Sequence, residues 1–116
     1  MSSRLPKHLH DALMAARRAH EFLGDLDAQA YAANALVRSA VERQMEILGE
    51  ACKRALDDTP DLSSRLPDMT LAIGLRNRLI HGYDKVLDAV VVTTVRHDLP
   101  LLMAALEAEL KRYPLP

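Results

Sequence analysis

The chain has 116 residues and a formal net charge of −1 at pH 7, with 49% hydrophobic and 27% charged residues. These values are typical of one globular domain over residues 1–116, and they exclude a strongly basic nucleic-acid binder. A single cysteine excludes a disulfide scaffold and a cysteine-based metal cluster. The apolar runs are short, and the N-terminus has no apolar stretch of the signal-peptide kind, so we expect a cytoplasmic protein without membrane contact.

The first half of the chain predicts two long helices joined by a short turn. The first runs over about 6–23, because a proline suits its first turn and Gly24 suits its end. An aspartate is expected to cap a short turn over 27–31, and Asn34 to cap the next segment. A long helix then runs over about 35–57, with apolar residues in a stripe on one side.

The middle of the chain predicts a loop and then a shorter helix. Residues 58–68 read as a loop with a helical turn at 62–66, because two aspartates and a proline end the preceding helix. The third helix is expected over about 69–81. Gly82 is the expected stop of this helix.

The last segment carries a conflict between local preference and context. Residues 89–95 are rich in β-branched side chains and would suit a strand, but the chain offers no partner strand. We therefore predict a helix over about 87–112, with a kink or a new start at Pro100. The tail 113–116 is expected to fray. The expected fold is all-α, an up-and-down bundle of four to five helices.

The most unusual stretch is Arg76-Asn77-Arg78-Leu79-Ile80-His81-Gly82-Tyr83, at the end of the third helix. Arg76 and His81 are about 140° apart around a helix, so they do not share a face strictly. A break at Gly82 would free the His81 side chain to turn toward Arg76. Asn77 lies one turn before His81 and can be its neighbour.

These residue types can cleave RNA without a metal ion. An arginine fork matches a phosphate, and a histidine can act as general acid or base near neutral pH. The base would take the proton of a ribose 2′-OH, whose oxygen then attacks the adjacent phosphorus. Spacing alone favours a plainer interpretation, in which the histidine satisfies helix-end carbonyls and the arginines face water.

Three segments together resemble one protein family. The stretch 76–83 resembles the Arg-x4-His-x-Tyr signature of the HepT-like toxins, which belong to the HEPN superfamily of ribonucleases. Residues 43–54, with Glu-Ile-Leu-Gly-Glu-Ala-Cys-Lys inside them, resemble the long helix of that family. Residues 98–102, Asp-Leu-Pro-Leu-Leu, resemble a segment of its last helix. Order and spacing agree with the family over about 28–110.

The resemblance implies a function and a set of roles. It implies a homodimer with two Arg–His pairs in a cleft, and an endoribonuclease that needs neither metal nor cofactor. Arg76 and His81 would be catalytic, while Asn77 and Arg78 would support them. Tyr83 would receive AMP units from a nucleotidyltransferase antitoxin of the MntA type. Each unit would inhibit the enzyme by adding negative charge and bulk beside the site.

Glutamates at positions 42, 46 and 50 form a row on the long helix. No Glu-x-x-His motif accompanies the row, so we expect no metal site there. Glu46 or Glu50 is instead expected to pair with Arg76 or Arg78.

Two alternatives to a catalytic toxin remain open. The chain can be a non-catalytic helical binding module that partners a nucleotidyltransferase, or a purely structural helical dimer. The Arg76, His81 and Tyr83 set favours the enzyme, because a scaffold has no chemical need for these three residues.

Overall fold

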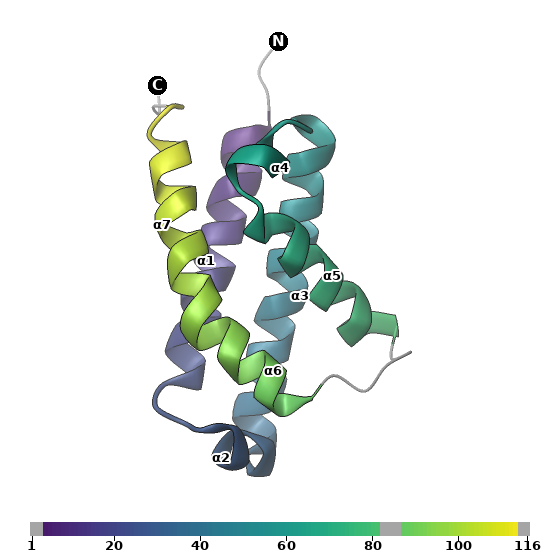
Figure 1. Cartoon of the computed structure of the whole chain (residues 1–116), viewed down its shortest axis with the longest axis vertical. Coiled ribbons are helices and arrows are strands. Elements are labelled where there is room, and N and C mark those ends of the chain that lie inside the picture. Colours follow the sequence, from purple (N-terminus) through teal and green to yellow (C-terminus); the bar gives the residue numbers. More distant parts are fainter. Residues whose placement is uncertain (1–3, 82–86, 114–116) are drawn as a thin grey trace.

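The computed structural model describes residues 4–81 and 87–113, and these residues contain helices and no strand. Four helices precede the one that carries the 76–83 motif: α1 (Leu5–Leu23), α2 (Ala28–Ala33), α3 (Ala35–Asp58) and α4 (Leu62–Arg65). They are followed by α5 (Asp68–His81), α6 (Asp88–Thr93), a π-helical turn η1 (Thr94–Asp98) and α7 (Leu99–Leu110). Figure 1 shows α1, α3 and α7 alongside one another, with α5 inclined across α3. The predicted all-α bundle is confirmed.

The helix ends follow local chemistry that the sequence predicts. Gly24 ends α1 with φ +56°, and its N–H donates to the carbonyl of His20. The Asp27 carboxylate accepts a hydrogen bond from the Ala30 N–H at 2.8 Å and so caps α2. Asn34 caps α3 in the same way, accepting from the Val37 N–H at 3.0 Å. These predicted ends and caps are confirmed.

The β-branched run in the last segment is helical, as context predicts and local preference does not. The predicted irregularity at Pro100 takes the form of the wider turn η1, and Pro100 itself lies in the first turn of α7. Pro100 has no backbone N–H to donate to the preceding turn, and the wider turn η1 lies directly before α7. The Thr94 hydroxyl donates to the Val90 carbonyl at 2.8 Å, just where α6 gives way to η1.

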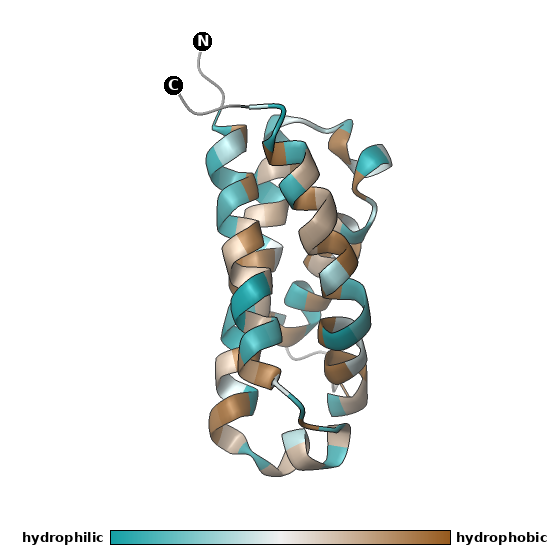
Figure 2. Cartoon of the chain, turned by 90° about the vertical axis from the view of Figure 1, so that its left-hand side faces the viewer, coloured by the Kyte–Doolittle hydropathy of each residue, from teal (hydrophilic) through white to brown (hydrophobic). Residues whose placement is uncertain are grey.

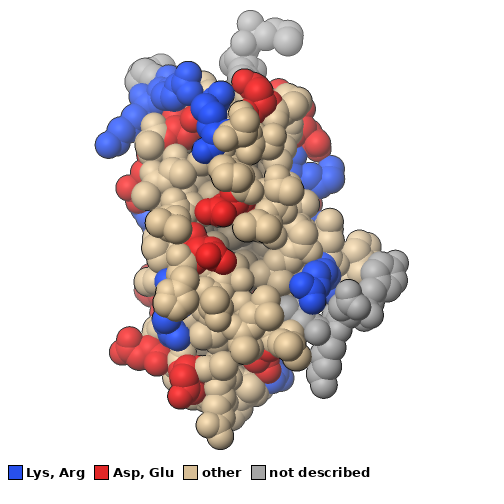
Figure 3. Space-filling view, in the orientation of Figure 1, with Lys and Arg blue, Asp and Glu red and all other residues tan. Residues whose placement is uncertain are grey.

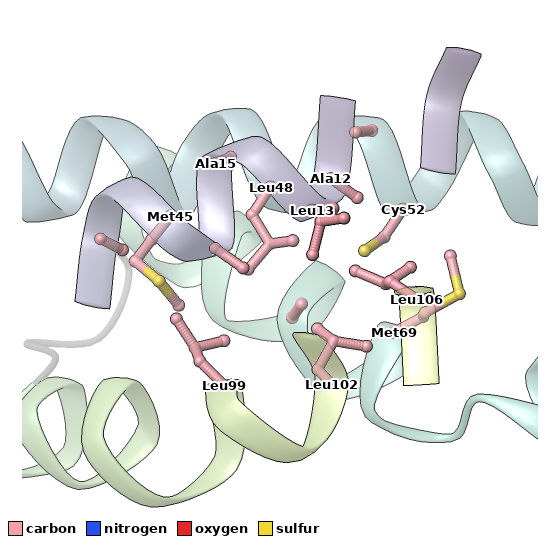
Figure 4. Close-up of a cluster of buried hydrophobic side chains, with 14 of the residues drawn as sticks. Ala12, Leu13, Ala15, Met45, Leu48, Cys52, Met69, Leu99, Leu102 and Leu106 are labelled. Atoms are coloured by element: carbon pink, nitrogen blue, oxygen red, sulfur yellow. The ribbon is translucent and has the colours of Figure 1, made fainter. Parts of the chain in front are cut away.

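The core lies where α1, α3, α5 and α7 meet, and aliphatic side chains fill it. Figure 4 shows Leu13, Met45, Leu48 and Leu102 converging from three of these helices. Along the helices, hydrophobic stretches alternate with hydrophilic ones (Figure 2). Cys52 is buried among these residues, and burial raises the pKa of its thiol to about 12. The thiol therefore stays protonated and packs as a small apolar group.

The segment Asp88–Leu110 is long and apolar enough to cross a membrane by length and composition alone, with a hydropathy of 1.4. Within its most apolar window of 18 residues, 33% is buried inside the structure. Core helices pass the same test, so the expected absence of membrane contact stays a prediction.

Candidate functional site

Helix α5 crosses α3 at Gly49, and the two helices are in direct contact there. A Cβ at position 49 would collide with Cβ of Arg76, and it would lie 2.7 Å from Cγ of Arg76. It would also lie 3.1 Å from the backbone oxygen of Ala72. A glycine at this position therefore lets the stem of Arg76 lie directly against the backbone of α3.

The guanidinium of Arg76 is held at both of its ends. Nη2 of Arg76 lies 3.1 Å from Oε2 of Glu50, and Nη1 donates to Oδ1 of Asn77 at 2.9 Å. Glu50 also accepts from Nε of Arg54 at 3.1 Å, so one carboxylate joins two arginines. The expectation that Glu46 or Glu50 pairs with an arginine of the motif is confirmed for Glu50 and Arg76.

Arg76 keeps the capacity to bind a further anion. Its side chain is 23% exposed, and each terminal nitrogen carries two N–H groups, of which one contact to Glu50 or Asn77 uses one. Nε of Arg76 is buried and has no hydrogen-bond partner among the described residues. The fixed stem and the unused N–H groups leave a preorganised fork that matches a phosphate or carboxylate.

A hollow of about 600 Å³ opens beside Arg76, between α1, α3 and α5; we call it the α1–α3 trough. Its floor is one stripe of α3 that carries charges at both ends. The residues around it are His8, His10, Asp11, Met14, Arg18, Arg43, Glu46, Ile47, Glu50, Ala51, Arg54, Arg76 and Ile80. The trough therefore brings Arg76 together with basic side chains from two other helices.

A second hollow of about 340 Å³, the α5–α7 groove, lies on the other side of α5. Its surface is mainly apolar and includes leucine, valine, methionine and alanine side chains, and Arg78, Asp68 and Asp98 also line it. Figure 3 views this face and shows acidic side chains at the central hollow. Because two positions along a helix differ by about 200° in direction, Arg78 lies away from Arg76 and its ion pair.

His81 is the last residue of α5, and its side chain is exposed. The trough contains Arg76 but not His81, as expected for two residues about 140° apart around one helix. Gly82 and Tyr83 lie outside the described residues, so the predicted break and the approach of Tyr83 stay predictions.

The glutamate row does not gather its carboxylates at one point. Glu42 lies 3.9 Å from Arg38, and Glu46 lies 3.4 Å from Arg43. Burial raises the pKa of Glu42, with Arg38 opposing this shift and Asp88 adding to it. In residues 4–81 and 87–113, no group of three or more His, Cys, Asp or Glu side chains is placed to hold a metal ion.

Sequence reasoning did not assign several residues that surround Arg76. Four of them could have been identified from their spacing, which places them on one stripe of α3: Arg43, Glu46, Glu50 and Arg54. The contribution of α1, from His8, His10 and Arg18, depends on how α1 packs against α3. No local pattern in the sequence predicts this contribution of α1.

Known proteins match the chain over most of its length. The family model described as "Ribonuclease HepT-like" matches residues 12–109. "Putative RNase MJ1380" of Methanocaldococcus jannaschii is 32% identical over 99 residues, which cover 85% of this chain and 90% of that protein. "Probable ribonuclease HepT" of Thermococcus cleftensis is 31% identical over 100 residues, which cover 86% and 90%. No solved structure matches at a significant level. The chain belongs to the HepT-like ribonuclease family.

Proposed function

We propose that this protein is a metal-independent endoribonuclease that acts as the toxin of a toxin–antitoxin pair. One observation carries the proposal: Arg76 is anchored by Gly49, Glu50 and Asn77 on the helix that ends at His81. This helix lies inside the region that matches the ribonuclease family, and relatives over that region are named as ribonucleases.

The proposed reaction is an attack within the RNA strand. The imidazole of His81 takes the proton of a ribose 2′-OH, and the 2′ oxygen forms a bond to the adjacent phosphorus. The bond from phosphorus to the 5′ oxygen breaks, and that oxygen receives a proton. The products end in a 2′,3′-cyclic phosphate and a 5′-hydroxyl. No metal ion or cofactor enters this scheme.

The arginine supplies the charge stabilisation. Arg76 binds the scissile phosphate with the N–H groups that Glu50 and Asn77 leave unused, and it stabilises the negative charge that builds up on the phosphate. Asn77 supports this step by fixing Nη1 of Arg76. Arg78, on the other side of α5, orients the substrate outside the reacting centre.

A homodimer fits this chemistry. The reaction needs one proton removed and one delivered, and one protomer carries a single His81, five positions after its Arg76. A two-fold interface would bring a second Arg76 and His81 to the same cleft.

Regulation by a partner nucleotidyltransferase completes the proposal. Tyr83 follows His81 by two positions, so AMP units attached to its hydroxyl would bring phosphodiester charge next to the proposed site. That charge would pair with Arg76 or Arg78 and repel the phosphates of RNA.

The test compares wild type with His81→Ala and Arg76→Ala on RNA in the presence of EDTA. We expect wild type to leave 2′,3′-cyclic phosphate ends, and His81→Ala to lose about 10²–10⁴-fold in rate. Arg76→Ala should lose about 10²–10³-fold, because it removes the preorganised charge. Circular dichroism of all three proteins checks that the variants fold.

Induced expression without any partner gene gives the matching readout in cells. Wild type should arrest growth and both variants should not. A folded wild type with unmodified Tyr83 that neither cuts RNA nor arrests growth would contradict the proposal. The non-catalytic binding module that partners a nucleotidyltransferase would then be the better description.

A further inference from the structure

We propose that the α1–α3 trough binds the RNA strand on either side of the scissile phosphate, with Arg18, Arg43 and Arg54 as phosphate ligands. This inference rests on the proposed function and deepens it, because it assigns a path for the substrate. The ligand class is single-stranded RNA, held through its phosphate backbone.

The charges in the trough favour a polyanion. It contains four arginines and two histidines against three acidic side chains. Each of these acids is already paired: Asp11 with Lys7 at 2.8 Å, Glu46 with Arg43 at 3.4 Å, and Glu50 with both Arg54 and Arg76 at 3.1 Å. The excess positive charge is therefore available to a ligand.

Arg18 is the clearest source of that charge. It is exposed, and it forms no hydrogen bond or ion pair within the part of the chain that the structure describes. Arg43 and Arg54 have partners, but their side chains are 69% and 62% exposed. Ion pairs between exposed side chains are weak, so a phosphate can replace or share the carboxylate partner.

The geometry of α3 matches a strand that passes Arg76. Arg43 and Arg54 are eleven positions apart on one helix, which corresponds to about 16 Å along its axis. Gly49 and Glu50, which hold Arg76, lie between them. A strand along the trough with its scissile phosphate at Arg76 would thus meet an arginine toward each end.

The other hollow has the wrong chemistry for this role. Asp68 and Asp98 line the α5–α7 groove together with apolar side chains and one arginine, Arg78, so the groove has no excess positive charge to hold a run of phosphates. Aromatic residues make up 3% of the chain, and none within residues 4–81 and 87–113 lines the trough, so these residues offer bases no Phe, Tyr or Trp to stack on there. Binding in the trough should therefore depend on phosphates more than on base identity.

The experiment measures RNA affinity against salt in a His81→Ala background, which prevents cleavage. The probe is a fluorescein-labelled oligouridine, read by anisotropy over a series of KCl concentrations. Arg18→Ala and Arg54→Ala should each lower the slope of log affinity against log salt by about 0.7, the value for one phosphate contact to a single strand. At about 0.1 M salt this corresponds to about fivefold weaker binding.

Neighbouring positions supply matched controls that leave the trough intact. Arg17 adjoins Arg18 but pairs with Glu107 of α7 at 2.8 Å, and Lys53 adjoins Arg54 but pairs with Asp57 at 3.0 Å. Arg17→Ala and Lys53→Ala remove the same charge from residues that do not line the trough. Their slopes should stay close to that of the His81→Ala parent.

The outcomes separate this inference from the proposed function. Equal slopes for the trough variants and the controls would overturn the inference, whatever the nuclease activity. Trough variants that lose self-association in sedimentation but keep the parental slope would also overturn it, and assign the trough to contact between two copies. If the trough variants show the expected slope changes but wild type never cuts RNA, the result would support RNA binding in the trough and refute the proposed nuclease activity.

Discussion

The two sides of α5 carry different chemistry, although they belong to one helix of fourteen residues. On one side Arg76 enters a polar trough, where Glu50 and Asn77 hold its guanidinium. On the other side Arg78 borders a mainly apolar groove, whose charged neighbours are Asp68 and Asp98. Two arginines that are two positions apart in one motif therefore meet different surroundings.

A compact motif can therefore present two kinds of surface from one helix. A helix turns by about 100° per residue, so a short polar run distributes its side chains over several faces. The side with preorganised charge suits substrate binding, since its N–H groups are fixed before the substrate arrives. The apolar side suits contact with another protein surface. Variants on either side of α5 can test this division.

The largest effect is expected from Gly49→Ala, which should disrupt the Arg76 side. The new Cβ would meet Cβ and Cγ of Arg76, which are near the backbone and cannot swing away freely. We expect a loss of about 1–3 kcal/mol in the free energy of unfolding, as for other forced overpacking, together with loss of RNA cleavage. Urea unfolding and the cleavage assay measure the two effects.

Gly74→Ala is the matched control on α5 itself. Nothing lies within 4 Å of a Cβ at position 74, and this position faces the groove. Replacing a helical glycine by alanine in open space should stabilise the protein by about 0.5–1 kcal/mol. If both variants shift the unfolding midpoint in the same direction, the close contact at Gly49 is not what positions Arg76.

A smaller effect is expected from Glu50→Gln, which removes the charge that holds Arg76 and Arg54. The glutamine keeps an acceptor but orients Arg76 less firmly, so we expect kcat to fall about tenfold, in line with the sensitivity of catalysis to misplacement. The KM should not rise, because Arg76 gains free charge for the substrate. Since the Glu50 side chain is 38% exposed, the stability should change little.

Steady-state kinetics on a defined RNA separates these quantities, and Glu107→Gln provides the control. Glu107 pairs with Arg17 on the surface and lies outside the trough. Its variant should keep both constants. A rise in KM at unchanged kcat for Glu50→Gln would contradict a positioning role and indicate loss of substrate binding instead.

Sequence reasoning predicts the helices well where their ends depend on neighbouring residues. The caps at Asp27 and Asn34 and the stop at Gly24 are of this kind, because each involves residues within one turn. The turn η1 is different. Sequence predicts an irregularity at Pro100, but its form depends on how α6 packs against α2 while α7 packs against α1.

The same limit applies to the candidate site. The motif itself points to Arg76, and the glutamate row narrows its partner to Glu46 or Glu50. The choice of Glu50 follows from where α5 crosses α3, and this crossing depends on Gly49. Arg18 belongs to α1, far away in the chain, so its place beside Arg76 emerges only from packing.

The smallest effect on catalysis is expected at an ion pair that lies outside both sides of α5. This pair serves as a reference for the pair between Glu50 and Arg76. Glu109 of α7 is 6% exposed and lies 3.1 Å from Arg65. Burial alone would raise the pKa of Glu109, but the hydrogen bonds and charge of Arg65 lower it overall. A carboxyl whose pKa is lower in the folded state stabilises the fold above its unfolded pKa, and this contribution is lost as the pH falls through the folded pKa.

We therefore expect Glu109→Gln to be less stable than wild type at neutral pH, with the difference shrinking as the pH falls below the ordinary value of 4.5. Urea unfolding of both proteins over a pH series measures this, and catalysis at neutral pH should remain. Glu50→Gln should show the reverse pattern, with impaired catalysis and nearly unchanged stability, because its ion pair is more exposed. If the two variants change alike in stability and in catalysis, the Glu50–Arg76 pair is a structural contact like Glu109–Arg65. That result would contradict the preorganisation of Arg76 for the substrate.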